Sequence, residues 1–206
     1  MSTDPTVMIA ITALGGYLLG SVPFGLVLTR MAGLGDIRDI GSHSIGATNV
    51  LRTGNKPLAF LTLIMDGGKG GIAVALGLYL SGSFEISLIA GTLAVFGHNY
   101  PIWLKFKGGK GMATTIGIIF VASWPIGVAV GLCWLAMAAI FRYSSFASIV
   151  CLSLAPVFSW FIVPEPDRMA MVLATGLLGV LSLIRHHENI SRLLKGTESK
   201  IGAKKK

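Results

Sequence analysis

A run of small and polar residues between positions 41 and 52 forms the first group of side chains suited to chemistry. It reads Gly-Ser-His-Ser-Ile-Gly-Ala-Thr-Asn-Val-Leu-Arg. Small residues let backbone N–H groups converge on an anion, and the guanidinium of Arg52 offers a planar fork to a phosphate. The plainer interpretation is a loop whose Ser and Asn side chains cap helices, and we favour it for Ser44 and Thr48 taken singly. The segment predicts an anion site that includes Arg52.

Glycines and lysines alternate in a second segment, which reads GHNYP at residues 97–101 and KFKGGKGMAT at residues 105–114. Backbone N–H groups without side chains around them, lysine ammonium groups and the start of the next helix together favour a phosphate site. The segment is not a nucleotide-binding P-loop, because Lys110 is followed by Gly111 and the first glycine of that motif is missing. Membrane charge rules alone explain Lys105, but they do not explain the interleaved glycines.

A third polar segment follows the last apolar run and reads RHHENISRL from Arg185. His186 and Asn189 stand one helical turn apart, so both face the same side. Histidine acts as an acid or base near neutral pH, and an amide orients a hydroxyl. For Arg192 we favour a simpler role, in which a long basic side chain reaches the membrane interface. Residues 204–206, three lysines, are interpreted as a tail held at anionic lipid.

Two charged residues, Asp66 and Lys69, interrupt an apolar run in the sequence DGGKGG over residues 66–71. Residues three apart share one helical face, so the two charges can neutralise each other. Alternatively Lys69 reaches a polar site, and the residues leave both readings open, with Asp66 assigned to structure. Each of the four glycines weakens a helix by about 1 kcal/mol relative to alanine, so we expect a short or broken helix here.

The elements that must position these segments are membrane helices. Of the 206 residues 53% are hydrophobic and only 13% are charged, and the mean hydropathy is +0.74. Uncharged stretches cover residues 7–29, 112–141 and 143–164, and about 20 apolar residues cross a bilayer. Such a composition excludes a soluble domain, a disordered chain and a secreted disulfide scaffold. The stretch 7–29 is too long for a signal-peptide core and is expected to be the first span.

The apolar runs predict an all-α bundle of seven spans. They cover residues 7–29, 57–80, 86–98, 112–123, 126–141, 145–163 and 169–184. Alternate connectors hold fifteen Lys and Arg, whereas the others hold Arg168 and four acids. Because positive charge stays in the cytoplasm, we expect the N-terminus outside and the C-terminus inside. One helix over 112–141 would reduce the count to six, but Pro125 favours a turn there.

Residues 1–206 are therefore expected to form a single multi-span membrane domain, with a basic, mobile tail over 199–206. The net charge of +8 follows the connectors, so nucleic acid is not expected as a partner. Cys133 and Cys151 lie in apolar stretches and are interpreted as packing residues. No group of His, Asp and Glu suggests a metal, and no cofactor is expected.

The segments in this order resemble one family over essentially the whole chain. They are GSxxxGATNVLRTGNK at residues 41–56, DxxKG at 66–70, GHxxPxxLKFKGGKGxAT at 97–114 and RHxxNIxRLxxGTE at 185–198. The chain resembles the bacterial integral-membrane acyl-phosphate:glycerol-3-phosphate acyltransferases, which make lysophosphatidic acid. The resemblance implies seven spans in the cell inner membrane and an active site at its cytoplasmic face. His43 and Ser44 depart from the usual pattern of the family, so neither is assigned a role.

The residues and the resemblance together give a set of candidate site residues. The expected catalytic residues are Ser42, His186 and Asn189. The expected substrate-binding residues are Arg52, Thr48, Asn49, Lys69, Lys107, Gly108, Gly109, Lys110 and Gly111. The implied partners are glycerol 3-phosphate, acyl phosphate, the lysophosphatidic acid product and membrane lipid.

The expected mechanism holds two anions side by side at the membrane surface. An acyl phosphate already has a good leaving group, so we favour direct transfer to the glycerol hydroxyl over an acyl-Ser42 intermediate. A small multi-pass transporter of an anionic solute is the alternative from another class, because half-helix ends also hold anions. A lipid-binding scaffold is a third. The gathering of basic residues in connectors and the lack of an inverted repeat disfavour transport.

Overall fold

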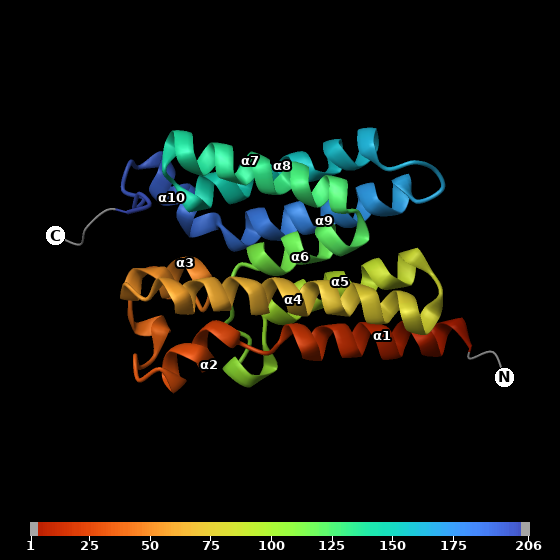
Figure 1. The fold of residues 1–206 in the computed structure, drawn as a ribbon, viewed down its shortest axis with the longest axis horizontal. Coiled ribbons are helices and arrows are strands. Elements are labelled where there is room, and N and C mark those ends of the chain that lie inside the picture. The colour runs from red at the N-terminus through yellow and green to blue at the C-terminus, as the bar shows by residue number, and fades with distance from the viewer. Residues whose placement is uncertain (1–3, 203–206) are drawn as a thin grey trace. The chain divides into compact units, whose positions relative to one another are not determined.

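The computed structural model of this protein describes residues 4–202, and within that range the chain forms helices and no strand (Figure 1). Residues 203–206, which include the predicted lysine tail, lie outside the described residues. The chain divides into two compact units, with unit 1 ending at Ala122 and unit 2 beginning at Ser123. The predicted single membrane domain over 1–206 stays a prediction.

Unit 1 holds the first polar segment and the glycine and lysine segment. Its elements are α1 (Pro5–Gly20), α2 (Phe24–Met31), η1 (Ile37–Asp39), α3 (Ala47–Val50), η2 (Leu51–Thr53), α4 (Lys56–Ser81), α5 (Phe84–Asn99), η3 (Ile102–Leu104) and α6 (Met112–Ala122). Unit 2 holds the third polar segment. Its elements are α7 (Trp124–Phe141), α8 (Ser144–Ile162), α9 (Arg168–Arg185) and α10 (His187–Leu194).

Each of the seven predicted spans coincides with a helix or with a pair of helices. Five segments are long and apolar enough to cross a membrane, namely residues 5–31, 56–81, 124–141, 144–162 and 168–185. Both α5, with 16 residues, and α6, with 11 residues, are shorter. The span count and the orientation stay predictions. The turn predicted before Pro125 is confirmed, because α6 ends at Ala122 and α7 begins at Trp124.

The first apolar run is not one straight helix. The helix is interrupted between Gly20 and Phe24, where Pro23 has no N–H to continue the helical hydrogen bonds. The break separates α1 from the short helix α2 and leaves the carbonyl of Val22 to bind a side chain. The sequence pattern of apolar residues does not reveal this interruption, because the residues on both sides of it are equally apolar.

Small residues let α1 approach α5 closely. A Cβ on Gly16 or Gly20 would collide with the backbone carbonyl of Ala90 or Ala94 on α5. Both pairs are spaced four residues apart, so the small residues line one face of each helix. In lipid the hydrophobic effect does not drive helices together, so such close van der Waals contact stabilises the pair. Figure 1 shows α1, α4 and α5 along one another within unit 1.

The expectation of a broken helix at residues 66–71 is wrong. α4 is continuous over 26 residues, and its glycines serve packing against α6. The carbonyl of Gly67 lies where a Cβ on Gly117 would be, and a Cβ on Gly70 would meet the carbonyl of Thr114. The close contact between the two helices offsets the low helix propensity of glycine.

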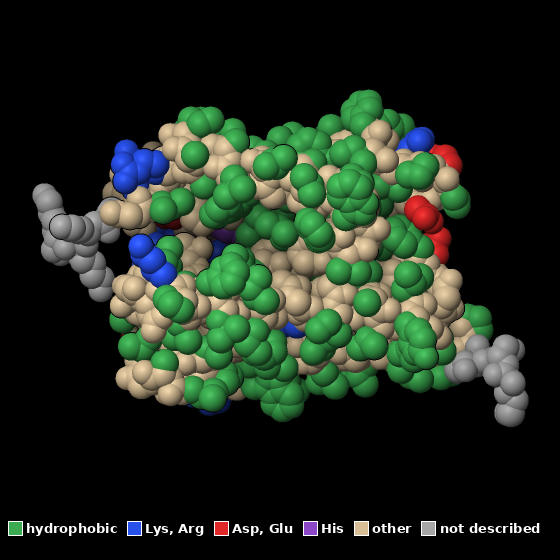
Figure 2. All heavy atoms as spheres, viewed as in Figure 1, with side chains coloured by type: hydrophobic (Ala, Val, Ile, Leu, Met, Phe, Trp, Pro, Cys, Tyr) green, Lys and Arg blue, Asp and Glu red, His purple; other side chains and the backbone are tan. Residues whose placement is uncertain are grey.

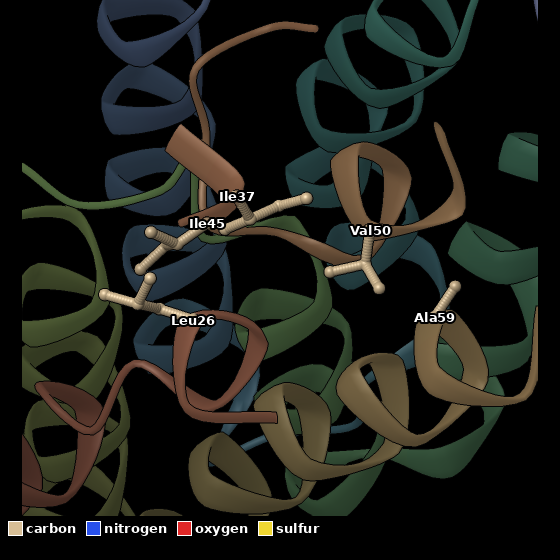
Figure 3. Close-up of a cluster of buried hydrophobic side chains, with 5 residues drawn as sticks. All are labelled: Leu26, Ile37, Ile45, Val50 and Ala59. Carbon is tan, nitrogen blue, oxygen red and sulfur yellow. The ribbon is translucent and has the colours of Figure 1, made fainter. Parts of the chain in front are cut away.

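A cluster of buried apolar side chains anchors the first polar segment to unit 1. Figure 3 shows Leu26 of α2 and Ala59 of α4 together with three residues that lie in the segment or just before it. These are Ile45 and Val50 of the segment and Ile37 of η1. Each of the three is at most 1% exposed, so the polar residues between them are held on a fixed backbone.

In unit 2 the helices pack in chain order, α7 on α8 and α8 on α9. Two side-chain hydrogen bonds join them, from Trp134 Nε1 to Ser148 Oγ at 3.1 Å and between Ser159 Oγ and Thr175 Oγ1 at 3.1 Å. The short helix α10 packs against α8 and α9. It therefore sets the place of His186 and Asn189 within unit 2.

Hydrophobic side chains cover much of the surface that Figure 2 displays. Large apolar residues more than half exposed occur on the long helices of both units. They include Leu14, Phe60, Ile64, Ile72, Tyr79, Leu132, Leu135, Ile140, Phe161, Leu173, Leu177 and Ile184. Such a surface is unfavourable in water and suits contact with lipid.

Candidate active site

Asn49 fixes the backbone of the first polar segment. Its side chain is buried, and Nδ2, which carries two hydrogens, lies 2.8, 3.1 and 2.8 Å from the carbonyl oxygens of Ile37, Ile40 and Ser44. Its Oδ1 accepts from the N–H of Ser42 at 3.0 Å. The amide nitrogen and the amide oxygen of Asn49 are thus both hydrogen-bonded to the backbone of the loop, which favours a structural role for Asn49 over contact with substrate.

Ser42 and Arg52 lie close together on this fixed loop. Ser42 sits between two left-handed residues, Gly41 with φ 61° and His43 with φ 54°. A Cβ on Gly41 would overlap the Arg52 side chain, so the guanidinium passes directly over this turn. Arg52 is exposed and Ser42 is half-buried. Ser42 and Arg52 are therefore neighbours, and their roles stay predictions. Thr48 lies exposed on α3.

The ring of His43 is hydrogen-bonded to the turn that precedes it. Its Nδ1 lies 2.7 Å from the carbonyl oxygen of Arg38, and a carbonyl only accepts, so Nδ1 carries the hydrogen. Ahead of it, Asp36 accepts three hydrogen bonds from Arg38, two from the guanidinium and one from the backbone N–H, and one from Arg30, at 2.6 to 2.9 Å. The Arg38 guanidinium holds the pKa of Asp36 well below its usual range, although burial opposes the shift. These ion pairs stiffen the turn that leads into the first segment.

Lys69 is buried inside unit 1 and each of its three donors has a partner. Nζ lies 2.8 Å from Asp66 Oδ1, 2.8 Å from the carbonyl oxygen of Val22 and 2.9 Å from His98 Nδ1. The side chains of Lys69 and Asp66 are 1% and 2% exposed. An ammonium has three hydrogens, so this geometry favours the ion-pair reading over direct contact with an anion.

The glycine and lysine loop is seated on the end of α5. Gly109 N–H donates to the carbonyl of His98 at 3.0 Å, and Gly108 N–H donates to that of Asn99 at 3.2 Å. A Cβ on Gly108 or Gly109 would overlap this helix end. Both N–H groups are thus donated to the end of α5 and not to a phosphate, while the assignment of Gly108–Gly111 to substrate binding stays a prediction. The glycines bring the loop backbone against α5 and present its lysines.

The lysines of this loop differ in exposure. Lys107 is exposed, and Lys110 is half-buried one residue before Gly111, which has φ 76° and directly precedes α6. A helix N-terminus carries partial positive charge. The side chains and the helix start together place positive charge at this end of unit 1, and the phosphate site stays a prediction.

His186 in unit 2 is held in one tautomer. Its Nδ1 lies 2.8 Å from the carbonyl oxygen of Ser182, one turn earlier in α9. Because a carbonyl accepts only, Nδ1 carries the hydrogen and Nε2 carries the lone pair. The ring is 3% exposed. This arrangement suits a general base, whose proton-accepting nitrogen must be oriented in advance.

Glu198 organises the third polar segment and was not assigned a role from the sequence. Its Oε1 accepts from Ser145 Oγ at 2.6 Å and from Asn189 Nδ2 at 2.6 Å, while Oε2 accepts from Arg192 Nε at 2.7 Å. Burial opposes ionisation, but these hydrogen bonds outweigh it and lower the pKa of Glu198. Arg192 thus binds a carboxylate rather than reaching for lipid, contrary to the expectation.

The structure brings the candidate residues together in three groups. The first is Ser42, Asn49 and Arg52, the second is Lys69, His98 and the loop 107–111, and the third is His186, Asn189 and Glu198. Ser145 was missed because it belongs to an apolar helix, far from Glu198 in sequence. Among residues 4–202 there is no group of three His, Cys, Asp or Glu residues that could hold a metal ion.

Comparison with known proteins decides the family. Residues 10–196 match the family model described as "Glycerol-3-phosphate acyltransferase". The chain belongs to the glycerol-3-phosphate acyltransferase family. A glycerol-3-phosphate acyltransferase of Rhodospirillum rubrum is 55% identical, with 98% of this chain and 95% of the relative covered. One of Paramagnetospirillum magneticum is 58% identical, with 94% of each covered.

A solved structure of a relative shares the fold. The crystal structure of PlsY (YgiH), an integral membrane glycerol 3-phosphate acyltransferase in its glycerol 3-phosphate form, superposes with a TM-score of 0.86. It is 35% identical and the match covers 94% of this chain and 96% of that one. The protein is thus an all-helical integral membrane acyltransferase of this family. The family assignment does not support the alternatives of a solute transporter or a lipid-binding scaffold.

Proposed function

We propose that this glycerol-3-phosphate acyltransferase uses acyl phosphate as its donor. It would transfer the acyl group to glycerol 3-phosphate and release 1-acyl-glycerol 3-phosphate and inorganic phosphate, in phospholipid biosynthesis. The donor rests on the resemblance of the four motifs between Gly41 and Glu198 to the acyl-phosphate-dependent enzymes. The acceptor and the product are supported by PlsY, a relative of the same fold, which has structures in a glycerol 3-phosphate form and a lysophosphatidic acid form. These are an acyl acceptor and its acylated product. The arrangement of the chain's own polar groups supports the same chemistry.

In the reaction the glycerol hydroxyl attacks the acyl carbonyl carbon. An ester C–O bond forms, the C–O bond to phosphate breaks, and the phosphate departs with its electron pair. The hydroxyl proton goes to His186 Nε2, whose lone pair is oriented by the hydrogen bond from Nδ1 to Ser182. Asn189, held by Glu198, would orient the acceptor.

The two phosphate groups need positive charge and fixed donors. We assign Arg52, which lies over the turn at Gly41, to the acyl phosphate, because its planar fork matches phosphate oxygens. Lys107 and Lys110, beside the start of α6, are assigned to glycerol 3-phosphate. Ser42 orients the acyl phosphate through its hydroxyl, and we favour direct transfer over an acyl-Ser42 intermediate. No metal or cofactor is assigned a step.

The location follows the charge distribution of the connectors. All three site segments belong to the basic connectors or to the basic C-terminal part of the chain. Because basic connectors stay in the cytoplasm, we place the site at the cytoplasmic face of the bacterial inner membrane. Cysteines introduced beside Glu85 should then react with an impermeant thiol reagent outside intact cells, and one at Gly54 should not.

The test of the donor uses purified protein in detergent with acyl phosphate alone and with glycerol 3-phosphate added. We expect phosphate release only when the acceptor is present, together with lysophosphatidic acid in equal amount. Acyl-CoA in place of acyl phosphate should give no product. Turnover with acyl-CoA and none with acyl phosphate would overturn the proposed donor.

The same assay separates direct transfer from a covalent route. A nucleophilic Ser42 would release a burst of phosphate before the acceptor is added and leave the acyl chain on the protein. Direct transfer predicts no burst and no mass increase. A stoichiometric acyl adduct at Ser42 that is discharged at the turnover rate would contradict direct transfer.

A further inference from the structure

The buried ammonium group of Lys69 in unit 1 contacts His98, the residue to which the glycine and lysine loop is hydrogen-bonded. Lys69 of α4 donates to Asp66 one turn away, to the carbonyl of Val22 at the break between α1 and α2, and to His98 in the last turn of α5. Its side chain is 1% exposed. One ammonium group therefore links three elements, and two of them lead directly into the polar segments.

The chemistry of the Lys69 ammonium decides which nitrogen of the His98 ring carries the hydrogen. An ammonium only donates, so His98 Nδ1, at 2.9 Å from Nζ, must accept. The ring then carries its hydrogen on Nε2. Lys69 thereby determines both the orientation and the tautomer of His98. Asp66 Oδ1, at 3.7 Å from His98 Nδ1, balances the charge of Lys69 within the same group.

His98 in turn seats the loop. Its carbonyl accepts from Gly109 N–H at 3.0 Å, and a Cβ on Gly109 would overlap its Nε2. Ring and backbone of one residue thus hold the loop from two sides. Only a glycine allows this approach, because any larger residue would displace the ring or the loop.

We propose that Asp66, Lys69 and His98 form a positioning relay that sets the glycine and lysine loop for binding glycerol 3-phosphate. None of the three touches the substrate in this proposal. They act by holding Gly109, and so by placing Lys107 and Lys110 on either side of it. The inference rests on the proposed function, in which this loop binds the acceptor phosphate.

The relay predicts that His98 and Gly109 are energetically coupled. His98→Asn keeps an oxygen near the position of Nδ1 for Lys69 but removes the ring atoms that lie against Gly109. Gly109→Ala adds the methyl group that the ring excludes. In the double variant the methyl group occupies the space that the shorter side chain leaves. Each single change should therefore harm acceptor binding, while the second change should cost little after the first.

The experiment measures kcat and KM for both substrates in wild type, the two single variants and the double variant. We expect Gly109→Ala to raise KM for glycerol 3-phosphate by about tenfold in the wild-type background and by less than about threefold in the His98→Asn background, within the range of coupling between contacting residues. KM for acyl phosphate should change by less than about twofold. Gly68→Ala, whose Cβ meets nothing within 4 Å, is the matched control and should leave both constants unchanged.

Two results would overturn the relay. They are multiplicative effects of the two substitutions, and equal rises in KM for both substrates. If Gly109→Ala does not fold, recovery of folded protein in the double variant shows the same coupling, and no recovery contradicts it. If the wild type turns over acyl phosphate but the variants show no coupling, only the relay is refuted. If the wild type shows no turnover with acyl phosphate, the proposed function is refuted.

A second variant tests Lys69 without leaving a lone buried charge. Asp66→Asn with Lys69→Met removes both charges together, which proteins tolerate far better than the loss of one. His98 then has no cationic donor to fix its ring. We expect a higher KM for glycerol 3-phosphate with kcat reduced less, and a folded double variant with wild-type KM would overturn the relay.

Discussion

Two carboxylates, Asp66 in unit 1 and Glu198 in unit 2, each hold a polar segment in place, but under different conditions. Asp66 lies inside a membrane helix, and its side chain and that of Lys69 are at most 2% exposed. Glu198 lies beyond the last helix; its own side chain is 6% exposed, but that of its partner Arg192 is 37% exposed. Water therefore reaches the second network through Arg192, and it does not reach the first. The same chemical group therefore contributes differently to stability in the two units.

The buried network should be costly to break one partner at a time. An unpaired charge in a low-dielectric interior keeps its desolvation penalty and loses the attraction that compensates it. In the Glu198 network, water solvates Arg192 when its carboxylate partner is removed, because the Arg192 side chain is 37% exposed. Four measurements can break or sharpen this comparison.

Asp66→Asn should have the largest effect. It leaves Lys69 charged and without its counterion, which typically costs about 3–5 kcal/mol. We expect loss of most folded protein, measured by size-exclusion chromatography and thermal unfolding in detergent. Asp39→Asn replaces an exposed carboxylate and serves as the control, with wild-type behaviour. A folded Asp66→Asn protein of wild-type stability would show that the buried pair contributes nothing.

Glu198→Gln should cost less stability but more activity. The amide keeps the shape of the side chain, but its NH2 group replaces an oxygen that accepted a hydrogen bond. Hydrogen bonds to charged groups contribute about 1.5–3 kcal/mol. Asn189 loses part of its support, so kcat should fall at least about tenfold through misorientation. Glu188→Gln is the control, because that carboxylate is 67% exposed and 3.6 Å from Arg192. Equal activity in both variants would contradict a role for Glu198.

The contrast between the networks also explains how far the sequence could predict them. Asp66 and Lys69 are three residues apart in one helix, so their pairing follows from helical periodicity. Glu198 meets Ser145 across 53 residues, and no local pattern reports such a contact. Likewise the seven apolar runs predicted the helices, because burial in lipid imposes a long uninterrupted pattern.

The sequence was least informative about its glycines. Glycines in α4 were expected to break the helix, but they pack against α6, and helix propensity is a weak guide where packing contributes more. The N–H groups of Gly108 and Gly109 were candidates for backbone donors in a phosphate site, but they bind the end of α5. A glycine in a sequence shows where backbone approaches closely, but not what approaches it.

The pH dependence of stability separates the Glu198 network from the rest of the molecule. Hydrogen bonds hold the pKa of Glu198 below its ordinary value of 4.5 in the folded state. The group therefore contributes stability above that value, and the contribution is lost as the pH falls through the lower, folded pKa. Thermal unfolding from about pH 7 to about pH 3 should show the difference between wild type and Glu198→Gln shrinking with acidity. A constant difference over this range would mean that the carboxylate charge is not the source of the stability.

Gly68→Ala should have the smallest effect and the opposite sign. Gly68 lies in the same turn of α4 as Asp66 and Lys69, but a Cβ there meets nothing within 4 Å. Alanine favours the helix by up to about 1 kcal/mol over glycine, so we expect a slightly higher unfolding temperature at unchanged activity. Gly117→Ala is the matched comparison, because its Cβ would overlap the Gly67 carbonyl and overpacking costs about 1–3 kcal/mol.

Gly68→Ala also tests whether the two units unfold together. If its gain in unfolding temperature also offsets the loss caused by Glu198→Gln, the two units unfold together. If it offsets only changes within unit 1, such as Asp66→Asn, then the two carboxylate networks stabilise separately unfolding units.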